Sequence, residues 1–459
     1  MKFKNPNQIL VTNQIIINLD KIIRTTMFFY RNLLIIFLLS IGHFGNTQIV
    51  IIKNGVVSCE SGSVFFCNGG IEIMNNSQFI NDGTVTVTKN SSIPQNGNFL
   101  INSNSTVSGN GLYEIEQDWV NDAQFNCGSS TVELFGNTQQ LVQSNSNTVS
   151  TFNNLTLTGN GAGNDRKKTL VNCNIFISNN GILDLNDREL ETQINTVTVN
   201  NNAVNAVINS LVFGQEGFVS STAPGSLIRS TNSNSNYTFP VGSSDNVLRY
   251  RPIIITPSAS NLNEFGVRMN NYDSNLDGYN RTVNDGTISN ANSFYYHSIT
   301  QPMGNDNAEV SILYYSMDDG VWSDMANWQN SWISLSNSNL NSSPNYSDVT
   351  VSNRSVKNNP SPYILVNLEE QFEVPNIFTP NNDGENDFFI SNAKNVTDYN
   401  FIIVNRWGQV VFESNDINAS WDGKYNDNLC TEGTYFYVLT GYGSNTKAIK
   451  KQGFLQLEY

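Results

Sequence analysis

One kind of segment recurs from Gln48 to about Asn236: three to five residues that alternate β-branched and polar side chains, followed by Asn-Gly, Asn-Asn or Ser-Gly. Alternation with a period of two is typical of half-buried strands, and Asn and Gly tolerate the left-handed conformations of tight turns. Comparable segments follow one another at a spacing of about 20 residues, which suits one coil of a stacked repeat protein. We therefore expect residues 48–235 to form a parallel β-solenoid, with a stack of antiparallel sandwiches as the alternative.

The composition fits such a stack. A coil of a solenoid cannot bury its apolar face alone, so it packs on the next coil, and Asn side chains at the corners can form ladders that satisfy their amide groups. Hydrophobic residues make up 39% of the chain, which is enough to fill a core, whereas charged residues make up only 14%. Amide and hydroxyl groups must therefore carry much of the solvation.

A second all-β region is expected at residues 236–370. Short strands separated by turn signals, such as the run RPIIITP at 251–257, indicate a β-sandwich. Three tryptophans, Trp322, Trp328 and Trp332, lie close together in the sequence of this region. They have two interpretations: a platform on which a sugar ring stacks, or ordinary sandwich core.

Charge and histidine content exclude several functions. The net charge is −15, and it is −19 from residue 48 onward, so the surface repels nucleic acid and anionic lipid. The two histidines are His43 and His297, which leaves little for histidine-dependent triads or histidine-ligated zinc. The one notable basic run, at 165–168, is predicted to be a solvated loop.

An apolar run near the amino end has the anatomy of a secretory signal peptide. Residues 27–47 contain Arg31, an apolar stretch from Leu33 to Ile41, and then small and polar residues. The alternative is a buried core helix. We hypothesise that Met27 is the true start and that residues 1–26 are an extension of the gene model. Other apolar runs fall short of membrane length, so we expect a protein that is not an integral membrane protein.

Five cysteines follow the predicted signal peptide: Cys59, Cys67, Cys127, Cys173 and Cys430. In an oxidising compartment the expected disulfide is Cys59 with Cys67, because the two flank a short loop, and Cys127 with Cys173 is a second candidate. The alternative is that all five are small buried hydrophobic side chains.

An acidic loop offers the only candidate cofactor, calcium. Asp273, Asn275 and Asp277 place side-chain oxygen ligands at its first, third and fifth positions. Tyr279 stands at the seventh position, where such loops use a backbone carbonyl. The twelfth position is Asn284, so the bidentate carboxylate of an EF-type loop is missing. An ordinary Asp/Asn-Gly turn is the alternative. The loop at 381–387 is a second acidic candidate, with a structural turn as its alternative.

The segment at 374–459 predicts a small all-β sandwich, with strands at 401–405, 409–413, 434–440 and 453–459. It also contains five ordered blocks of aromatic, Asn, Asp and Gly residues. The blocks are Phe378, Thr379, Pro380, Asn381, Asn382, Asp383 and Gly384 with Asn386 and Asp387; Asn405, Arg406, Trp407 and Gly408; Val411 and Phe412; Trp421, Asp422 and Gly423; and Gly433, Thr434, Tyr435, Phe436 and Tyr437.

In these blocks the segment closely resembles the gliding-motility-associated C-terminal domain, the type B sorting domain of the type IX secretion system of Bacteroidetes. The resemblance covers under a fifth of the chain. It implies a route: entry into the periplasm by the signal peptide, passage through the outer membrane with the type IX secretion machinery as partner, and display at the cell surface or release. It implies no catalytic activity.

The sequence thus predicts a secreted, non-catalytic, all-β scaffold of the cell surface. We expect it to be adhesive or structural, with repeated polar faces that bind surface glycans or other cell-surface proteins. The alternative is an enzyme, a β-solenoid polysaccharide lyase or a glycosidase, which needs two carboxylates facing each other across a sugar. A passive component of the envelope, with neither ligand nor turnover, is the third class.

Overall fold

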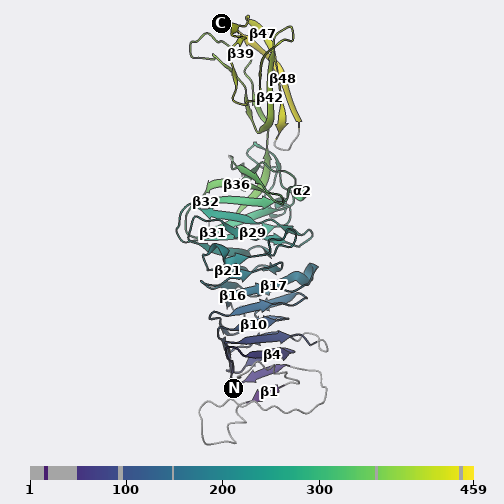
Figure 1. Ribbon diagram of the computed structural model, residues 1–459, viewed down its shortest axis with the longest axis vertical. Helices are drawn as coiled ribbons and strands as arrows, with labels where there is room; N and C mark the ends of the chain where they lie inside the picture. Colours follow the sequence, from purple (N-terminus) through teal and green to yellow (C-terminus); the bar gives the residue numbers. More distant parts are fainter. Residues whose placement is uncertain are drawn as a thin grey trace.

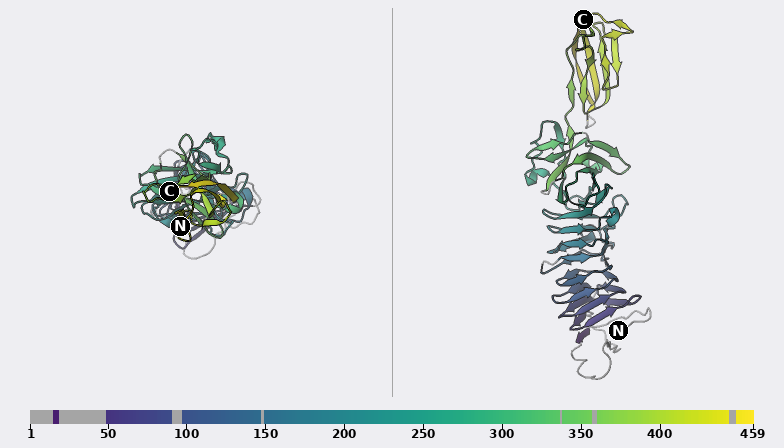
Figure 2. Two further views of the ribbon diagram at one scale, coloured as in Figure 1. Left: turned by 90° about the horizontal axis from the view of Figure 1, so that it is seen from above. Right: turned by 90° about the vertical axis from the view of Figure 1, so that its left-hand side faces the viewer.

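A computed structural model describes residues 15–18, 49–90, 97–146, 149–336, 338–356, 360–443 and 448–459. The described chain forms a rod with three parts in line: a stack of coils, a β-sandwich, and a small β-domain that carries the carboxyl end (Figure 1). The view along the rod and the view from its side agree with this order (Figure 2). The predicted all-β class is confirmed.

The first part is a parallel β-solenoid, as predicted, with three strands to most coils. One face is a nine-stranded parallel sheet. Its strands, in order, are β1 (Ile15–Asn18), β2 (Val50–Lys53), β5 (Gly70–Met74), β8 (Asn98–Ile101), β11 (Trp119–Asn121), β14 (Gln140–Gln143), β17 (Lys167–Val171), β20 (Glu189–Glu191) and β23 (Phe218–Ser220).

The second face is a seven-stranded sheet of β4 (Val64–Asn68), β7 (Thr84–Thr88), β10 (Leu112–Ile115), β13 (Thr131–Leu134), β16 (Asn154–Leu157), β19 (Leu183–Asp184) and β22 (Val207–Ile208). The third face has two stretches: β3 (Val56–Cys59), β6 (Gln78–Asn81), β9 (Thr106–Ser108) and β12 (Gln124–Asn126), then β15 (Ser150–Phe152), β18 (Ile175–Ile177), β21 (Thr196–Val199) and β24 (Ser226–Thr231). Two short 3₁₀ helices, η1 (Gly163–Arg166) and η2 (Val204–Ala206), lie in loops between strands.

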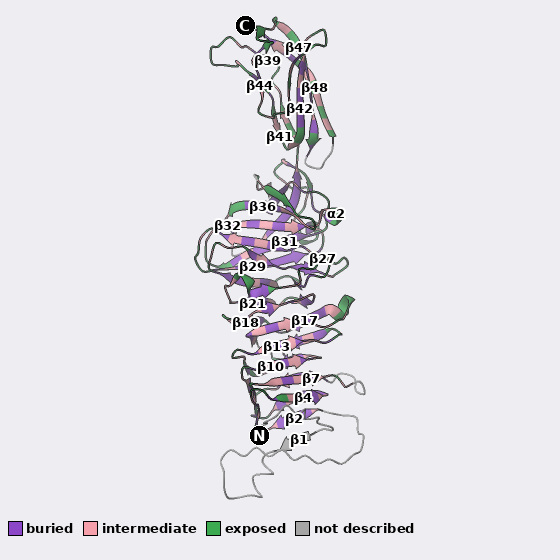
Figure 3. Cartoon of the chain, viewed as in Figure 1, coloured by how far each residue is buried: buried purple, intermediate pink, exposed green. Residues whose placement is uncertain are grey.

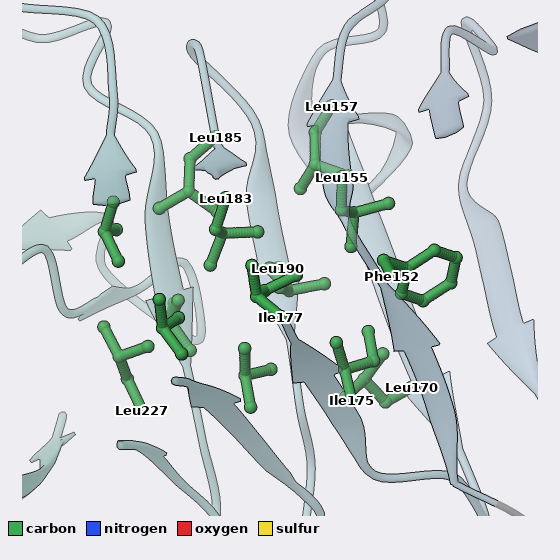
Figure 4. Close-up of a cluster of buried hydrophobic side chains, with 14 of the residues drawn as sticks. Phe152, Leu155, Leu157, Leu170, Ile175, Ile177, Leu183, Leu185, Leu190 and Leu227 are labelled. Carbon is green, nitrogen blue, oxygen red and sulfur yellow. The ribbon is translucent and has the colours of Figure 1, made fainter. Parts of the chain in front are cut away.

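Side chains alternate between the interior and the surface along most of these strands, as β7 shows with Val85 and Val87 buried between half-exposed threonines. Figure 3 shows the same alternation of burial along the stack. Figure 4 shows leucine and isoleucine side chains from neighbouring strands meeting in the interior. Burial of apolar side chains from coil to coil stabilises each coil on the next.

Asparagines occupy the corners, although not as simple ladders. Asn54, Asn75 and Asn104 adopt positive φ angles of 50°, 55° and 63°, as tight turns require. Other side-chain amides bridge coils by bonding to backbone: the Asn81 Nδ2 donates to the Leu112 carbonyl (2.9 Å), and the Asn174 Oδ1 accepts from the Thr196 amide (2.9 Å). These two amide groups therefore bond to the backbone of the neighbouring coil.

The coils are more variable in length than the predicted spacing. From β2 onward, paired Cα atoms on adjacent coils lie between 18 positions apart, for Thr106 and Gln124, and 30 positions apart, for Thr196 and Ser226. The extra residues lie in the loops between strands, because the strands themselves keep register.

The solenoid passes into the sandwich through one strand. β24 pairs in parallel with β21 on one side and antiparallel with β29 (Asn263–Asn270) on the other. A single hydrophobic core runs from Val50 in the solenoid to Leu365 in the sandwich. The two parts therefore share a core as well as a sheet.

The sandwich packs two antiparallel sheets and includes α2 (Ser316–Asp319) and η3 (Ser274–Asp277). One sheet continues from β29 with β31 (Tyr296–Met303), β37 (Ser361–Leu368), β33 (Asp324–Trp328) and β34 (Trp332–Ser334), and β30 (Ile288–Ala291) pairs with β37. The other comprises β25 (Tyr237–Phe239), β28 (Ile253–Pro257), β32 (Ala308–Tyr314), β36 (Ser347–Arg354) and β35 (Asn339–Ser342), and a separate hairpin is formed by β26 (Gly242–Ser243) and β27 (Arg249–Tyr250).

The tryptophans of the sandwich belong mainly to its core. Trp322 and Trp332 are 5% and 0% exposed. Trp328 is half-buried and packs on Trp332, with ring centroids 5.3 Å apart. Of the two interpretations, core therefore holds for Trp322 and Trp332.

Two sequence expectations are wrong. No disulfide joins the cysteines in the part of the chain that the structure describes: the Cys59 and Cys67 thiols instead donate to the Ser63 and Gly70 carbonyls. The basic run at 165–168 is only partly a solvated loop, because Lys167 and Lys168 lie in β17 and are buried. Carboxylate and carbonyl partners inside the coil stack accommodate the two ammonium groups.

The C-terminal domain has a core of its own. Its main sheet has the order β39 (Ile377–Phe378), β48 (Ala448–Leu457), β47 (Gly433–Gly443), β42 (Val396–Val404) and β43 (Val410–Ser414). Three strand pairs complete it: β38 (Gln371–Glu373) with β41 (Asn392–Lys394), β40 (Phe389–Ile390) with β44 (Ser420–Trp421), and β45 (Lys424–Tyr425) with β46 (Asn428–Leu429).

No helix among the described residues is long and apolar enough to cross a membrane. The predicted signal peptide at 27–47 lies outside the described residues. So does the proposed extension at 1–26, except for β1, which pairs in parallel with β2.

Candidate functional site

The aromatic residues of the C-terminal motif blocks form the centre of their domain. Trp421 lies between Phe378 and Tyr435, with ring centroids 5.3 Å from each, and all three side chains are buried. The Trp421 Nε1 donates to the Lys424 carbonyl at 2.8 Å. These blocks therefore hold the domain together, since buried aromatic rings contribute large apolar areas.

The first block continues into a tight acidic loop. The Asp387 carboxylate accepts hydrogen bonds from the Asn382 amide (2.6 Å) and the Gly384 amide (2.9 Å). The Asn381 Oδ1 accepts from the Asp383 amide (3.0 Å), and the Thr379 amide donates to the Asn386 carbonyl (2.9 Å). Side-chain oxygens thus cap backbone amides, which is how Asx turns are built.

The loop packs against the Trp421-Asp422-Gly423 block. A Cβ added to Gly423 would lie 2.9 Å from the Cγ of Pro380, and Gly423 has a φ of +77°. Both the space and the backbone conformation favour glycine at this position. Two motif blocks about 40 residues apart therefore meet through Pro380 and Gly423.

The Asn405 block makes the exposed turn between β42 and β43. The Asn405 Oδ1 accepts from the Trp407 amide (3.0 Å) and the Gln409 amide (3.1 Å), and Gly408 has a φ of +81°. The Trp407 side chain is 85% exposed. An indole held in water by a rigid turn suits recognition, because large apolar side chains gain stability when a partner covers them.

A small pocket of about 130 Å³ brings this turn beside the last motif block. It lies between Arg406 and Trp407 on one side and the segment from Thr431 to Tyr435 on the other. The Tyr435 hydroxyl donates to the Thr431 carbonyl (2.9 Å), and this bond holds the second side of the pocket in place. Thr431 and Glu432 belong to this surface although no motif pointed to them. The one signal for them in the sequence is their place directly before Gly433.

The predicted calcium loop is engaged in protein contacts. The Arg281 Nε and Nη2 donate to the two carboxylate oxygens of Asp273 at 2.9 and 2.8 Å, and this guanidinium holds the pKa of Asp273 below its usual value. The Asn275 Oδ1 accepts from the Arg281 amide at 2.8 Å. Asp273 also caps η3 by accepting from the Asn275 amide.

The other two predicted ligands face different partners. The Asp277 carboxylate accepts from the Tyr272 hydroxyl (2.8 Å) and from the Tyr296 hydroxyl. The Tyr279 carbonyl accepts from the Ser274 hydroxyl (2.9 Å) and the Trp332 Nε1 (3.2 Å). Within the described ranges no three His, Cys, Asp or Glu side chains gather in a group that could hold a metal ion. Calcium at this loop stays a prediction.

Comparison with known proteins identifies the C-terminal domain. Residues 372–457 match the family model of the CHU_C Type IX secretion signal domain, which confirms the resemblance noted in the sequence. No curated protein and no solved structure matches the chain. The type IX secretion signal domain implies interaction with that secretion machinery and export to the cell surface or the extracellular space.

Proposed function

We propose that this chain is a non-catalytic adhesin or surface scaffold, exported by the type IX secretion system, whose solenoid and sandwich bind glycans or other cell-surface proteins. One observation supports it above others. The secretion signal domain has a separate core at one end of the rod, so the shared core of solenoid and sandwich forms a distinct exported body (Figure 1).

The surface of that body favours binding through many weak polar contacts. Half-exposed Thr, Asn and Ser residues alternate with the buried ones along its strands, as in β7 and β16. Hydroxyl and amide groups repeated at the coil spacing offer hydrogen bonds to polyhydroxylated polymers. Repetition gives avidity, because each further contact forms at a high effective concentration.

Export is the first test. Cells that make the full chain are compared with cells that make a version ending before Glu373, and both surface and medium are probed. We expect only the full chain outside the cell. Export of both forms would contradict the role of the C-terminal domain, and export of neither would contradict the proposed route.

Binding and turnover form the second test. The purified exported chain is incubated with an array of glycans and with matched soluble polysaccharides, and both retention and product release are measured. Retention without products supports the proposal. A new reducing end or an unsaturated sugar that disappears with one carboxylate substitution would support a glycosidase or lyase instead.

A further inference from the structure

A pocket of about 190 Å³ lies where the last coils of the solenoid meet the sandwich. Loop residues between β22 and β23, among them Phe213 and Glu216, form one wall. The sandwich supplies the other walls through Tyr250 of β27, Tyr315 before α2, and Tyr346 before β36. Sites at the junction of two folded parts are favoured places for ligands because several segments converge there.

Five aromatic rings line this junction pocket, those of Phe213, Phe218, Tyr250, Tyr315 and Tyr346. The Phe213 ring lies 5.0 Å from the Tyr315 ring and 5.5 Å from the Tyr346 ring, measured between centroids. Tyr346 in turn lies 6.1 Å from Tyr250. Phe213 is nevertheless 41% exposed, so an apolar face remains open to a ligand.

Polar groups stand among these rings in fixed positions. The Tyr346 hydroxyl donates to the Glu216 Oε1 at 2.7 Å, and burial together with this carboxylate raises the pKa of Tyr346, which keeps the hydroxyl protonated. Arg166 reaches the pocket with its guanidinium 5.2 Å from the centre of the Phe218 ring. The Arg166 Nε is buried and has no hydrogen-bond partner within the part of the chain that the structure describes.

Both positive charges of the pocket, those of Arg166 and Arg251, are compensated. Glu216 lines the pocket with Arg166, while Arg251 donates to the Asp319 carboxylate and lies 3.7 Å from the Asp318 Oδ2. The chain as a whole carries −15, so it repels anions at long range. An anionic ligand finds neither an uncompensated positive charge in the pocket nor attraction outside it.

We propose that the junction pocket binds one ring of a neutral sugar at the end or along the length of a glycan. This inference rests on the proposed function and adds the class of glycan that binds and the place where it binds. The C–H face of a pyranose packs on aromatic rings, while its hydroxyls can donate to carboxylates such as those of Glu216 and Asp318. The volume is below that of ordinary drug-sized sites, which limits the occupant to a group of about one ring.

The test uses the full chain after export and two sets of probes. The neutral set is cellopentaose, laminaripentaose, mannopentaose and xylopentaose, and the anionic set is oligomers of galacturonate and alginate. Affinity is measured by calorimetry, and the contacted sugar protons are identified by saturation-transfer NMR. We expect at least one neutral oligosaccharide to bind and the anionic set to bind at least tenfold more weakly.

Two variants locate the binding. Phe213→Ala removes a partly exposed ring, and Tyr346→Phe removes only a hydroxyl, so circular dichroism and the unfolding midpoint should show that both still fold. We expect a loss of affinity of at least tenfold for Phe213→Ala and about threefold to tenfold for Tyr346→Phe. The matched control is Phe454→Ala, an exposed phenylalanine (61%) of the C-terminal domain, which should leave affinity unchanged.

Each other outcome overturns a specific statement. Neutral glycans that bind wild type, Phe213→Ala and Tyr346→Phe equally would overturn the pocket while the proposed function stands. Preference for the anionic set would overturn the ligand class. Absence of binding to every glycan, with capture of a protein partner instead, would overturn both the pocket and glycan binding by the scaffold.

Discussion

Arg251 and Asp319 form a bidentate ion pair inside the sandwich although they are 68 positions apart in the chain. The Arg251 Nε and Nη2 donate to the two carboxylate oxygens of Asp319, the second at 2.9 Å, and both side chains are buried. The Tyr295 hydroxyl also donates to Asp319, at 3.0 Å. The pair joins α2 to the segment that enters β28, beside the junction pocket.

Loss of one partner of this pair should destabilise the sandwich strongly. In Asp319→Ala the buried Arg251 charge loses its bidentate partner and keeps only the exposed Asp318 carboxylate, 3.7 Å away, and we expect a loss of about 3–5 kcal/mol in the free energy of unfolding. Denaturant unfolding followed by circular dichroism measures it. The control is Asp318→Ala, whose side chain is 62% exposed and which should change stability little. Equal losses in the two variants would contradict this role for the pair.

The aromatic stack in the solenoid core should contribute about as much to the free energy of unfolding as the Arg251–Asp319 pair does. Trp119 is 0% exposed and stacks on Phe99, with ring centroids 5.0 Å apart and planes 6° from parallel. Trp119→Ala leaves a cavity, for which we expect a cost of about 3–5 kcal/mol. Trp119→Phe should cost less because a ring remains. If Trp119→Ala unfolds at the same denaturant concentration as wild type, the stack does not stabilise the coils.

One glycine lies where two coils approach each other closely. A Cβ on Gly181 would lie 1.7 Å from the Asn153 carbonyl oxygen, a separation that atoms cannot adopt. Gly181→Ala must therefore separate two coils, and we expect a loss of at least 2 kcal/mol, at the upper end of ordinary single substitutions. Gly62→Ala is the control: its φ is +78° but nothing lies within 4 Å, so only about 1–2 kcal/mol of backbone strain is expected.

Sequence patterns predicted the local features of this fold and missed its long-range ones. Period-two alternation and Asn-rich corners are local, so the solenoid and the four main strands of the C-terminal domain could be predicted from them. The sharing of β24 by two sheets could not, because antiparallel pairing with β29 depends on tertiary register. The predicted disulfide between Cys59 and Cys67 failed for a related reason: loop length does not fix where two thiols point.

The candidate sites also divide into one that is local in the sequence and one that depends on long-range contacts. The motif blocks of the C-terminal domain are continuous in sequence, so the domain could be identified from them. The junction pocket joins Phe213 to Tyr346 across 133 positions, and neither residue stands in a recognisable motif. Only the folded chain places their rings together.

Buried Lys168 should make the solenoid sensitive to pH. Its ammonium donates to the Gly136 carbonyl (2.9 Å) and to Gln140, and the side chain is 0% exposed. Burial, together with the positive charge of Arg188, lowers the pKa of Lys168 to about 7. In the unfolded chain this lysine has an ordinary pKa of about 10.4. Between the two pKa values the unfolded chain therefore binds more protons than the folded chain. Stability from this group therefore rises with pH from about 7 to about 10, by up to about 1.4 kcal/mol per unit.

The comparison with Lys168→Met isolates this effect. We expect the free energy of unfolding of wild type to increase relative to the variant at each step from pH 7 to pH 10, as measured by urea unfolding. Exposed Lys450→Met should follow wild type at every pH. A difference between wild type and Lys168→Met that does not change with pH would contradict the prediction.

Two tryptophans of the secretion signal domain should separate folding from export. Trp421 is 1% exposed and packs on Phe378 and Tyr435, whereas Trp407 is 85% exposed on its turn beside the small pocket. Trp421→Ala should cost about 3–5 kcal/mol and lower export because the domain no longer folds. Trp407→Ala should change stability by no more than about 0.5 kcal/mol, yet lower export if the secretion machinery covers this indole.

The amount of protein at the surface and in the medium measures export, and the unfolding midpoint of each purified chain measures stability. Normal export of a stable Trp407→Ala chain would show that the machinery recognises another part of the domain, since the fold would be intact and the exposed ring dispensable.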